Sequence, residues 1–416
     1  MAGQAPGVFF AEWRERRPGQ RRDLGRAAEL LAGLGLPALD APVLGVVGSK
    51  GKGTCAAYAS ATLAAAGAGV VTVTSPGVTG PRDRIRFNGA AIGDGGLARL
   101  AAELGTAVRR LPPPRNGYLS PSGLFLAAGA LHARERGADV LVLEAGMGGA
   151  SDELSLFDPV AIALTTVFGE HLGVLGDTVE QLAAEKAGVA GPGARAFVHG
   201  TLDAGAEAAA RAALAARTAG RVPPERLRPG ASGLPARLLP EGLGRPAAEL
   251  GYTAARRLLA ATARAEPPPA RLHEVLSTVR LPGRLSHHRV PGSDTELIVD
   301  SAVDRAGVAA ALDHARRHWG EAGGADHVLV CLPDHKDVAG AVAELAGLGV
   351  TAATLPDAHL EFSAALPRHW GRVRAQEVTP RLLAGLGRRV LVLGTVYFTG
   401  RVLEAVAADT ESLFTA

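Results

Sequence analysis

Residues 43–67 constrain the fold of this chain more than any other segment. They read VLGVVGSKGKGTCAAYASATLAAAG: an apolar strand, a glycine-rich turn and an alanine-rich helix. The glycines let successive backbone N–H groups converge at the helix N-terminus, where the helix dipole also favours an anion. Lys52 would reach the β- and γ-phosphates of a nucleotide, and the Thr54 hydroxyl would be a Mg²⁺ ligand. The segment therefore predicts an ATP-binding phosphate loop formed by Gly48, Ser49, Lys50, Gly51, Lys52, Gly53 and Thr54.

The lysines of the chain point to chemistry as well. Only four of its 44 basic residues are lysine: Lys50, Lys52, Lys186 and Lys336. Only lysine offers a compact ammonium whose pKa shifts readily or whose amine can be carbamylated. The loop reads G-S-K-G-K-G-T rather than the common G-x-x-x-x-G-K-[ST], so a flexible turn that happens to contain lysines is the alternative. The strand before it and the helix after it favour a phosphate loop, and an enzyme is the first hypothesis.

Length and composition exclude several other classes. A chain of 416 residues predicts two or three domains with proper cores. The formal charge of +3 is spread along the sequence, so no nucleic-acid partner is expected. No apolar stretch approaches a membrane span, and the two cysteines are expected to be buried thiols. We expect a cytoplasmic protein that is a monomer, with small-molecule partners and no membrane association.

A second chemical group follows a later strand. Residues 139–149, DVLVLEAGMGG, predict an apolar strand that ends in Glu144 and a glycine turn. A carboxylate at the C-terminal edge of a parallel strand near a phosphate loop is well placed to hold Mg²⁺. Taken alone, a glutamate at a strand end is more often a cap or a solvated edge.

The loop GSKGKGT resembles the GTNGKGS loop of the folylpolyglutamate synthase/dihydrofolate synthase branch of the Mur ligase superfamily. DVLVLEAGMGG is similar to that family's LEVGLGG, whose glutamate binds metal. Residues 160–189 match a long family pattern that contains T, D-H, L-G-x-T and E-K-A-G. The resemblance implies that His171 is a second metal ligand and that Lys186 is carbamylated and helps to position Mg²⁺. Glu170 stands where the family has aspartate.

The resemblance also implies substrate-facing residues in the N-terminal part. TVTSPGVTGPRDRIRFNG (72–89) is similar to the family's TSPHL…ERIRING. Ser75 would approach the metal or the γ-phosphate, and Arg84 would contact an anionic substrate group. Asp152 is the one residue kept from the family's RLDATN and is a predicted substrate residue.

The C-terminal part continues the resemblance with departures. LPGRLSHHRV (281–290) resembles the family's WPGRLE, so Arg284 would face the nucleotide phosphates and stabilise charge during phosphoryl transfer. The family's D-G-A-H-N-P reads DSAVDR here: Asp300 is kept as a nucleotide-binding residue, whereas Val303 and Asp304 replace the histidine and asparagine. Lys336 lies in a segment that parallels the family's G-D-K-D and is a predicted substrate residue.

These features predict an α/β protein. Residues 1–280 would form a P-loop domain of the Mur ligase central-domain type with a parallel sheet, and residues 281–416 a smaller Rossmann-like domain. The implied activity is an ATP- and Mg²⁺-dependent ligase that converts a carboxylate to an acyl phosphate and couples it to an amine, with glutamate expected. The departures favour an acceptor other than folate. The alternatives are a housekeeping folylpolyglutamate/dihydrofolate synthase and a nucleotide-binding homologue without catalysis.

Overall fold

The chain divides into two compact units. Unit 1 comprises Met1–Pro240, Arg245–Val279 and Glu411–Ala416, and unit 2 comprises Glu241–Gly244 and Arg280–Thr410. The predicted boundary at residue 280 lies beside the main junction, whereas the segments 241–244 and 411–416 fall on the other side from the one expected. The computed structural model describes residues 7–38, 40–170, 172–320, 324–356, 362 and 366–416.

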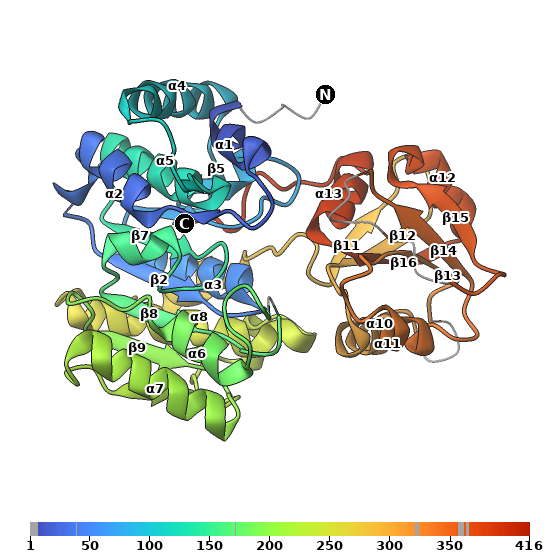
Figure 1. Cartoon of the computed structure of the whole chain (residues 1–416). Helices are drawn as coiled ribbons and strands as arrows, with labels where there is room; N and C mark the ends of the chain where they lie inside the picture. The colour runs from blue at the N-terminus through green and yellow to red at the C-terminus, as the bar shows by residue number, and fades with distance from the viewer. Residues whose placement is uncertain (1–6, 39, 171, 321–323, 357–361, 363–365) are drawn as a thin grey trace. The chain divides into compact units, whose positions relative to one another are not determined.

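Unit 1 is built on a sheet that is parallel over most of its width (Figure 1). Among the described residues its strand order is β10-β9-β8-β2-β7-β3-β4-β5, with β4 and β5 antiparallel at one edge. A separate parallel pair joins β1 to β6. The strands are β1 Arg21–Arg22, β2 Val43–Val47, β3 Val70–Val73, β4 Ile85–Phe87, β5 Ala90–Ala91, β6 Gly117–Tyr118, β7 Val140–Glu144, β8 Ala161–Leu164, β9 Ala196–His199 and β10 Pro224–Arg226.

The central strands of this sheet are apolar runs because both of their faces are covered by helices. Every residue of β2 and β7 is buried. The helix that follows β2 is buried almost all round, and it packs against α8, where a Cβ on Gly251 would stand 2.1 Å from the Cys55 carbonyl oxygen. The helices of unit 1 are α1 Ala11–Glu15, α2 Leu24–Gly33, α3 Lys52–Ala65, α4 Asp94–Arg110, α5 Pro121–Arg136, α6 Val179–Ala187, α7 Ala204–Thr218, α8 Arg245–Ala261 and α9 Pro269–Ser277.

Unit 2 contains a second sheet, of order β11-β12-β16-β13-β14-β15 among the described residues. Only its edge strand β11 runs antiparallel to its neighbour there. The α/β class predicted from the sequence, with two parallel-dominated sheets, is confirmed. The elements are β11 Ser286–Arg289, β12 Glu296–Asp300, α10 Arg305–Trp319, β13 His327–Cys331, α11 Val338–Glu344, β14 Val350–Thr354, β15 Gly371–Arg374, α12 Pro380–Leu386, β16 Arg389–Gly394 and α13 Val396–Ala405.

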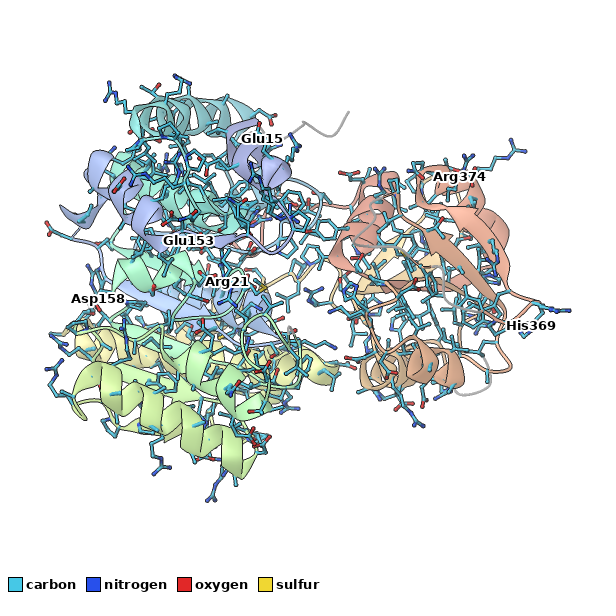
Figure 2. All side chains as sticks on the ribbon, viewed as in Figure 1. Glu15, Arg21, Glu153, Asp158, His369 and Arg374 are labelled. Atoms are coloured by element: carbon cyan, nitrogen blue, oxygen red, sulfur yellow. The ribbon has the colours of Figure 1, made fainter. Side chains whose placement is uncertain are left out.

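The side chains of Arg21 and Glu153 belong to unit 1, whereas Arg374 ends β15 of unit 2 (Figure 2).

In the part of the chain that the structure describes, we find no helix with the length and apolar character that a membrane crossing requires.

Candidate active site

The glycine-rich turn lies between the carboxyl end of β2 and the first turn of α3. Gly51 caps α3 with φ of 82°, a left-handed conformation that favours glycine. At Gly48 an added Cβ would stand 1.8 Å from Thr165 Oγ1, so only glycine fits there. The Ser49 N–H donates to the Thr166 carbonyl oxygen at 2.7 Å, which ties the turn to the chain after β8. The turn and the N-terminus of a long helix thus have the geometry expected of the predicted phosphate loop.

Two lysine side chains meet at the head of this loop. Lys52 Nζ donates to the Gly48 carbonyl oxygen at 3.0 Å, and Lys186 Nζ, which comes from α6, donates to the same oxygen at 3.2 Å. Lys186 is almost fully buried, and its Nζ lies 3.6 Å from Glu170 Oε1. Two ammonium groups beside a helix N-terminus form a strongly anion-attracting position.

Burial is the main reason that the pKa of Lys186 falls from its ordinary 10.5 to about 8, and the positive charge of Lys52 adds to this effect. Between about pH 8 and 10.5 the unfolded chain binds a proton at this position and the folded chain does not. We therefore expect the free energy of unfolding to rise with pH across this window, by at most about 3 kcal/mol.

The variant Lys186→Met retains the buried stem and lacks the titration, so its pH profile should be flatter than that of the parent. Chemical denaturation of both proteins at a series of pH values in CO₂-free buffer measures the difference. Parallel profiles would contradict the environment that the structure assigns to Lys186.

Glu144 ends β7 and faces the first turn of α3. Its Oε2 accepts a hydrogen bond from the Ser75 N–H at 3.0 Å, and a Cβ on Gly53 would stand 3.7 Å from the same oxygen. The Thr54 side chain, in the same turn, is buried. A hydroxyl and a carboxylate are hard oxygen donors of the kind that Mg²⁺ prefers, and this ion usually takes few protein ligands and completes its shell with water and phosphate oxygens. The residues present therefore fit Mg²⁺.

Ser75 and Arg84 form a second pair beside Glu144. Arg84 Nη2 donates to Ser75 Oγ at 3.0 Å, Nε donates to the Thr74 carbonyl oxygen at 3.2 Å, and the guanidinium lies 3.9 Å from the centroid of the Phe125 ring. Arg84 is buried, and these contacts hold its guanidinium in one orientation. The structure thus brings Ser75 and Arg84 together at the edge of the sheet where Glu144 lies.

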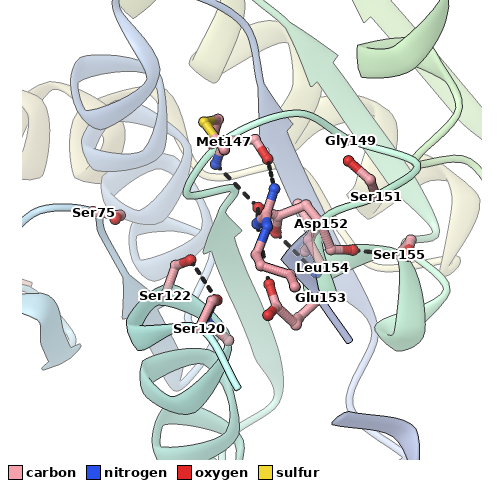
Figure 3. Close-up of polar contacts among 12 residues, drawn as sticks. Ser75, Ser120, Ser122, Met147, Gly149, Ser151, Asp152, Glu153, Leu154 and Ser155 are labelled. Atoms are coloured by element: carbon pink, nitrogen blue, oxygen red, sulfur yellow. Dashed lines mark hydrogen bonds and ion pairs between the residues drawn. The ribbon is translucent and has the colours of Figure 1, made fainter. Parts of the chain in front are cut away.

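The glycine turn after β7 is held by a buried ion-pair network (Figure 3). Asp152 is fully buried: its Oδ2 accepts from Arg22 Nη1 at 2.7 Å and from the Met147 N–H at 3.0 Å, and Oδ1 accepts from the Leu154 N–H at 3.0 Å. Arg22 also pairs with Glu153 at 3.2 Å and donates to the Met147 carbonyl oxygen. Asp152 is thus enclosed by protein groups, and this favours a positioning role over the direct substrate contact predicted for it.

Arg22 is the cation that compensates both carboxylates. Burial, followed by the adjacent Asp152 charge, raises the pKa of Glu153. Arg22→Met should therefore lower the free energy of unfolding by about 3–5 kcal/mol, because two buried carboxylates lose their partner. Urea denaturation at neutral pH measures this. Arg21→Met, at the exposed neighbour, is the matched control with an expected change below about 0.5 kcal/mol. Equal losses in the two variants would contradict the network.

The remaining predicted residues are distributed as follows. Lys50 lies at the rim of the loop with its Nζ 5.5 Å from the centroid of the Phe168 ring. His171 lies outside the described residues. Unit 2 carries the other three: Arg284 Nη1 donates to the Gly283 carbonyl oxygen at 2.9 Å, Asp300 Oδ2 accepts from the Leu285 N–H at 2.8 Å, and Lys336 lies in the turn after β13. The roles predicted for Arg284 and Asp300 toward the nucleotide and for Lys336 toward the substrate stay predictions.

Two residues that position the site were not singled out from the sequence. Arg22 lies 130 residues from Asp152, and nothing in the local spacing links them. Glu185 is the second: its Oε1 accepts from the Ser151 N–H at 2.8 Å and from the Gly149 N–H at 3.2 Å. The family pattern contains Glu185, but only as an unassigned match.

A phosphate-loop domain with a mainly parallel sheet, followed by a smaller α/β unit with its own mainly parallel sheet, defines a class: the two-domain Mur ligase fold. Comparison with solved structures supports this fold assignment. Folylpolyglutamate synthase of Lacticaseibacillus casei in its apo form has a TM-score of 0.76 at 21% identity, over 96% of this chain and 99% of that one. The Mycobacterium tuberculosis enzyme complexed with ADP has a TM-score of 0.76 at 20% identity, over 98% of this chain and 100% of that one.

Sequence comparison points to the same group. The dihydrofolate synthase/folylpolyglutamate synthase of Bacillus subtilis is 31% identical over 172 residues, which are 41% of this chain and 40% of the relative. The folylpolyglutamate synthase of Lacticaseibacillus casei is 34% identical over 168 residues, 40% of this chain and 39% of the relative. The matched parts thus span about two fifths of these relatives. No protein-family model matches the chain. The resemblance to the folylpolyglutamate synthase/dihydrofolate synthase branch of the Mur ligase superfamily is confirmed.

Proposed function

We propose that this protein is an ATP-dependent ligase that joins a carboxylate to the amine of an amino acid. The observation that carries the proposal is the convergence of Lys52 and Lys186 on the Gly48 carbonyl oxygen, with Glu144 facing the same helix turn. A nucleotide-binding loop alone requires one lysine. A second, buried lysine from another helix, with a lowered pKa, is the kind of group that is enriched at sites that also do chemistry.

The loop residues bind and orient the nucleotide. The backbone N–H groups from Ser49 to Thr54 and the N-terminus of α3 hold the phosphate oxygens. The Lys52 ammonium leaves the Gly48 carbonyl oxygen and pairs with the β- and γ-phosphates. Thr54 and Glu144 would hold Mg²⁺, which when bound supplies charge neutralisation at the transferring phosphoryl group.

Lys186 is suited to become a carbamate. Its pKa of about 8 leaves about a tenth of the amine neutral at pH 7, far more than for an ordinary lysine, and only the neutral amine adds to CO₂. Addition of the neutral amine to CO₂ forms an N–C bond, opens one C=O π bond and releases one proton. Counted from the ammonium form, two protons leave and a cation becomes an anion. The Lys186 carbamate is no longer repelled by the Lys52 ammonium, and its two oxygen atoms would lie close to the loop.

The reaction then proceeds in two displacements. A carboxylate oxygen of the acceptor attacks the γ-phosphorus, the bond to the β-phosphate oxygen breaks, and ADP leaves with its electron pair. The amine nitrogen of the second substrate attacks the carbonyl carbon of the acyl phosphate, loses a proton, and inorganic phosphate leaves. Arg84, fixed by Ser75 and Phe125, is proposed to orient an anionic group of the acceptor.

For the acceptor we infer a pteroate or folate carboxylate, with glutamate as the amine. The sequence departures favoured a non-folate acceptor, but the relatives are named as folate enzymes, and their similarity supports the housekeeping alternative better. The solved structures include a folylpolyglutamate synthase with the ATP analogue AMPPCP and folate. Arg284, Asp300 and Lys336 are proposed to complete the nucleotide and substrate contacts.

Isotope transfer tests this chemistry. An acceptor whose carboxylate carries ¹⁸O is incubated with MgATP and glutamate, and the released phosphate is analysed by mass spectrometry. One labelled oxygen in the phosphate for each amide formed is expected, because the acyl phosphate leaves with a carboxylate oxygen. Amide formation with unlabelled phosphate would overturn the acyl phosphate route.

A further inference from the structure

Three histidines of unit 2 form a group at the edge of its sheet. His287 on the edge strand β11 faces His314 and His318 on α10. Figure 1 shows helix α10 beside the sheet that contains β11. Together with Glu241 they line an open pocket of about 650 Å³. The proposed ligase chemistry uses none of these side chains.

The hydrogen bonds of this group fix the tautomer of one ring. His314 Nδ1 lies 3.0 Å from Glu241 Oε2, and a carboxylate only accepts, so this nitrogen carries the proton. In the neutral ring Nε2 then carries the lone pair, and it is directed at His287, whose Nε2 lies 2.9 Å away. A carboxylate that accepts from one ring nitrogen while the other nitrogen presents its lone pair is the arrangement found behind metal-binding histidines.

A third imidazole is within reach. His318 is one helical turn after His314, and the two rings are nearly parallel, at an interplanar angle of 7°. Its ring centroid lies 4.2 Å from that of His287. Two histidines at positions i and i+4 on a helix face are a recurrent zinc-binding pair. The two arginines that line the pocket are each 3.6 Å from a carboxylate, Arg317 from Glu241 and Arg289 from Glu296, so their charges are compensated.

We propose that His287, His314 and His318 bind a divalent transition-metal ion of the zinc class, with Glu241 orienting His314 and water as the fourth ligand. Three imidazole nitrogens suit zinc, nickel or copper rather than magnesium. The ion would link the edge strand β11 to the C-terminal turn of α10. This proposal does not depend on the proposed ligase activity.

Binding requires a small local rearrangement. As they stand, no three histidine, cysteine or carboxylate side chains within the described residues are arranged for coordination. Two nitrogens bound to one tetrahedral ion are about 3.3 Å apart, so the 2.9 Å between His287 and His314 must widen slightly. The His287 proton moves to Nδ1, and the exposed His318 ring turns toward the other two.

A Co²⁺ titration tests the site. The untagged full chain is titrated in excess Mg²⁺, and the visible absorption of tetrahedral Co²⁺ is followed, with Zn²⁺ added afterwards as a competitor. We expect one equivalent of Co²⁺ with this spectrum, displaced by Zn²⁺, and a higher melting temperature with either ion. Absence of a stoichiometric spectrum would overturn the proposal.

Variants locate the ion. His287→Ala and His318→Ala change exposed side chains, should fold normally, and should each weaken binding at least about tenfold; Glu241→Gln should weaken it about 10- to 100-fold. His327→Ala, on β13 outside the pocket, is the matched control and should bind like the parent. A Co²⁺ signal that persists in both His287→Ala and His318→Ala would place the ion elsewhere and overturn the proposal.

Discussion

Replacing Lys52 with alanine is expected to lower ATP turnover by at least about a thousandfold and to weaken nucleotide binding. The ammonium of Lys52 lies at the head of the phosphate loop, 3.0 Å from the Gly48 carbonyl oxygen, and is the group that would meet the charge of the transferring phosphoryl group. Alanine is a good helix former at the first position of α3, so the fold should be kept. Coupled measurement of ADP release, together with titration of a fluorescent ATP analogue, tests both effects.

Arg211→Ala is the matched control for Lys52→Ala. It removes one positive charge from an exposed position of α7, where Arg211 pairs only loosely with Glu207 at 3.5 Å. This variant should keep the parent rate and affinity. Unchanged turnover and nucleotide affinity in Lys52→Ala would show that the loop does not bind the phosphates.

Changes at Lys186 are expected to have an effect of similar size. If Lys186 works as a carbamate, both Lys186→Ala and Lys186→Arg should lose about a thousandfold in ligase rate, because neither side chain can take up CO₂. Retention of activity in Lys186→Arg would show instead that a positive charge suffices. Rates are measured as ADP release at saturating ATP.

Chemical rescue separates the two roles of Lys186. The alanine variant removes a long side chain from a buried part of the site and leaves a space there for a small added molecule. Formate or acetate should restore part of the rate if the native group is an anionic carbamate. Restoration by a short alkylamine, and none by the carboxylates, would contradict carbamylation.

The phosphate loop and the strand-end glutamate could be predicted because both depend on local sequence. The order of strand, glycines and helix in residues 43–67 admits few structures, and the structure has β2, the turn and α3 there. Glu144 was expected beside the loop because the carboxyl ends of parallel strands share one edge of a sheet. Strands β2 and β7 are indeed neighbours, so Glu144 reaches the first turn of α3.

The groups that support the site could not be predicted in this way. Arg22 compensates Asp152 and Glu153 through contacts that only the tertiary fold creates. The grouping of His287 with His314 depends likewise on the packing of α10 against β11, since 27 residues separate the two. Sequence periodicity predicts single helices and strands. It does not predict which charged side chains of different elements come into contact.

One departure from the family pattern has a structural explanation. Asp304, which stands where the family has asparagine, caps α10 by accepting from the Gly307 N–H at 2.9 Å. Val303 is buried in the core of unit 2. These two residues stabilise the start of α10, so their presence is compatible with an active ligase and does not require loss of function.

Release of ADP from MgATP and glutamate, with dihydropteroate, a reduced folate or one of several unrelated carboxylic acids, tests the central claim most directly. We predict that ADP appears only when glutamate is combined with a pteroate or folate acceptor, and that one amide forms for each ADP. Nucleotide binding with no ADP formation from any acid, or ADP formation that needs no acid, would contradict the assignment of this protein as a carboxylate–amine ligase.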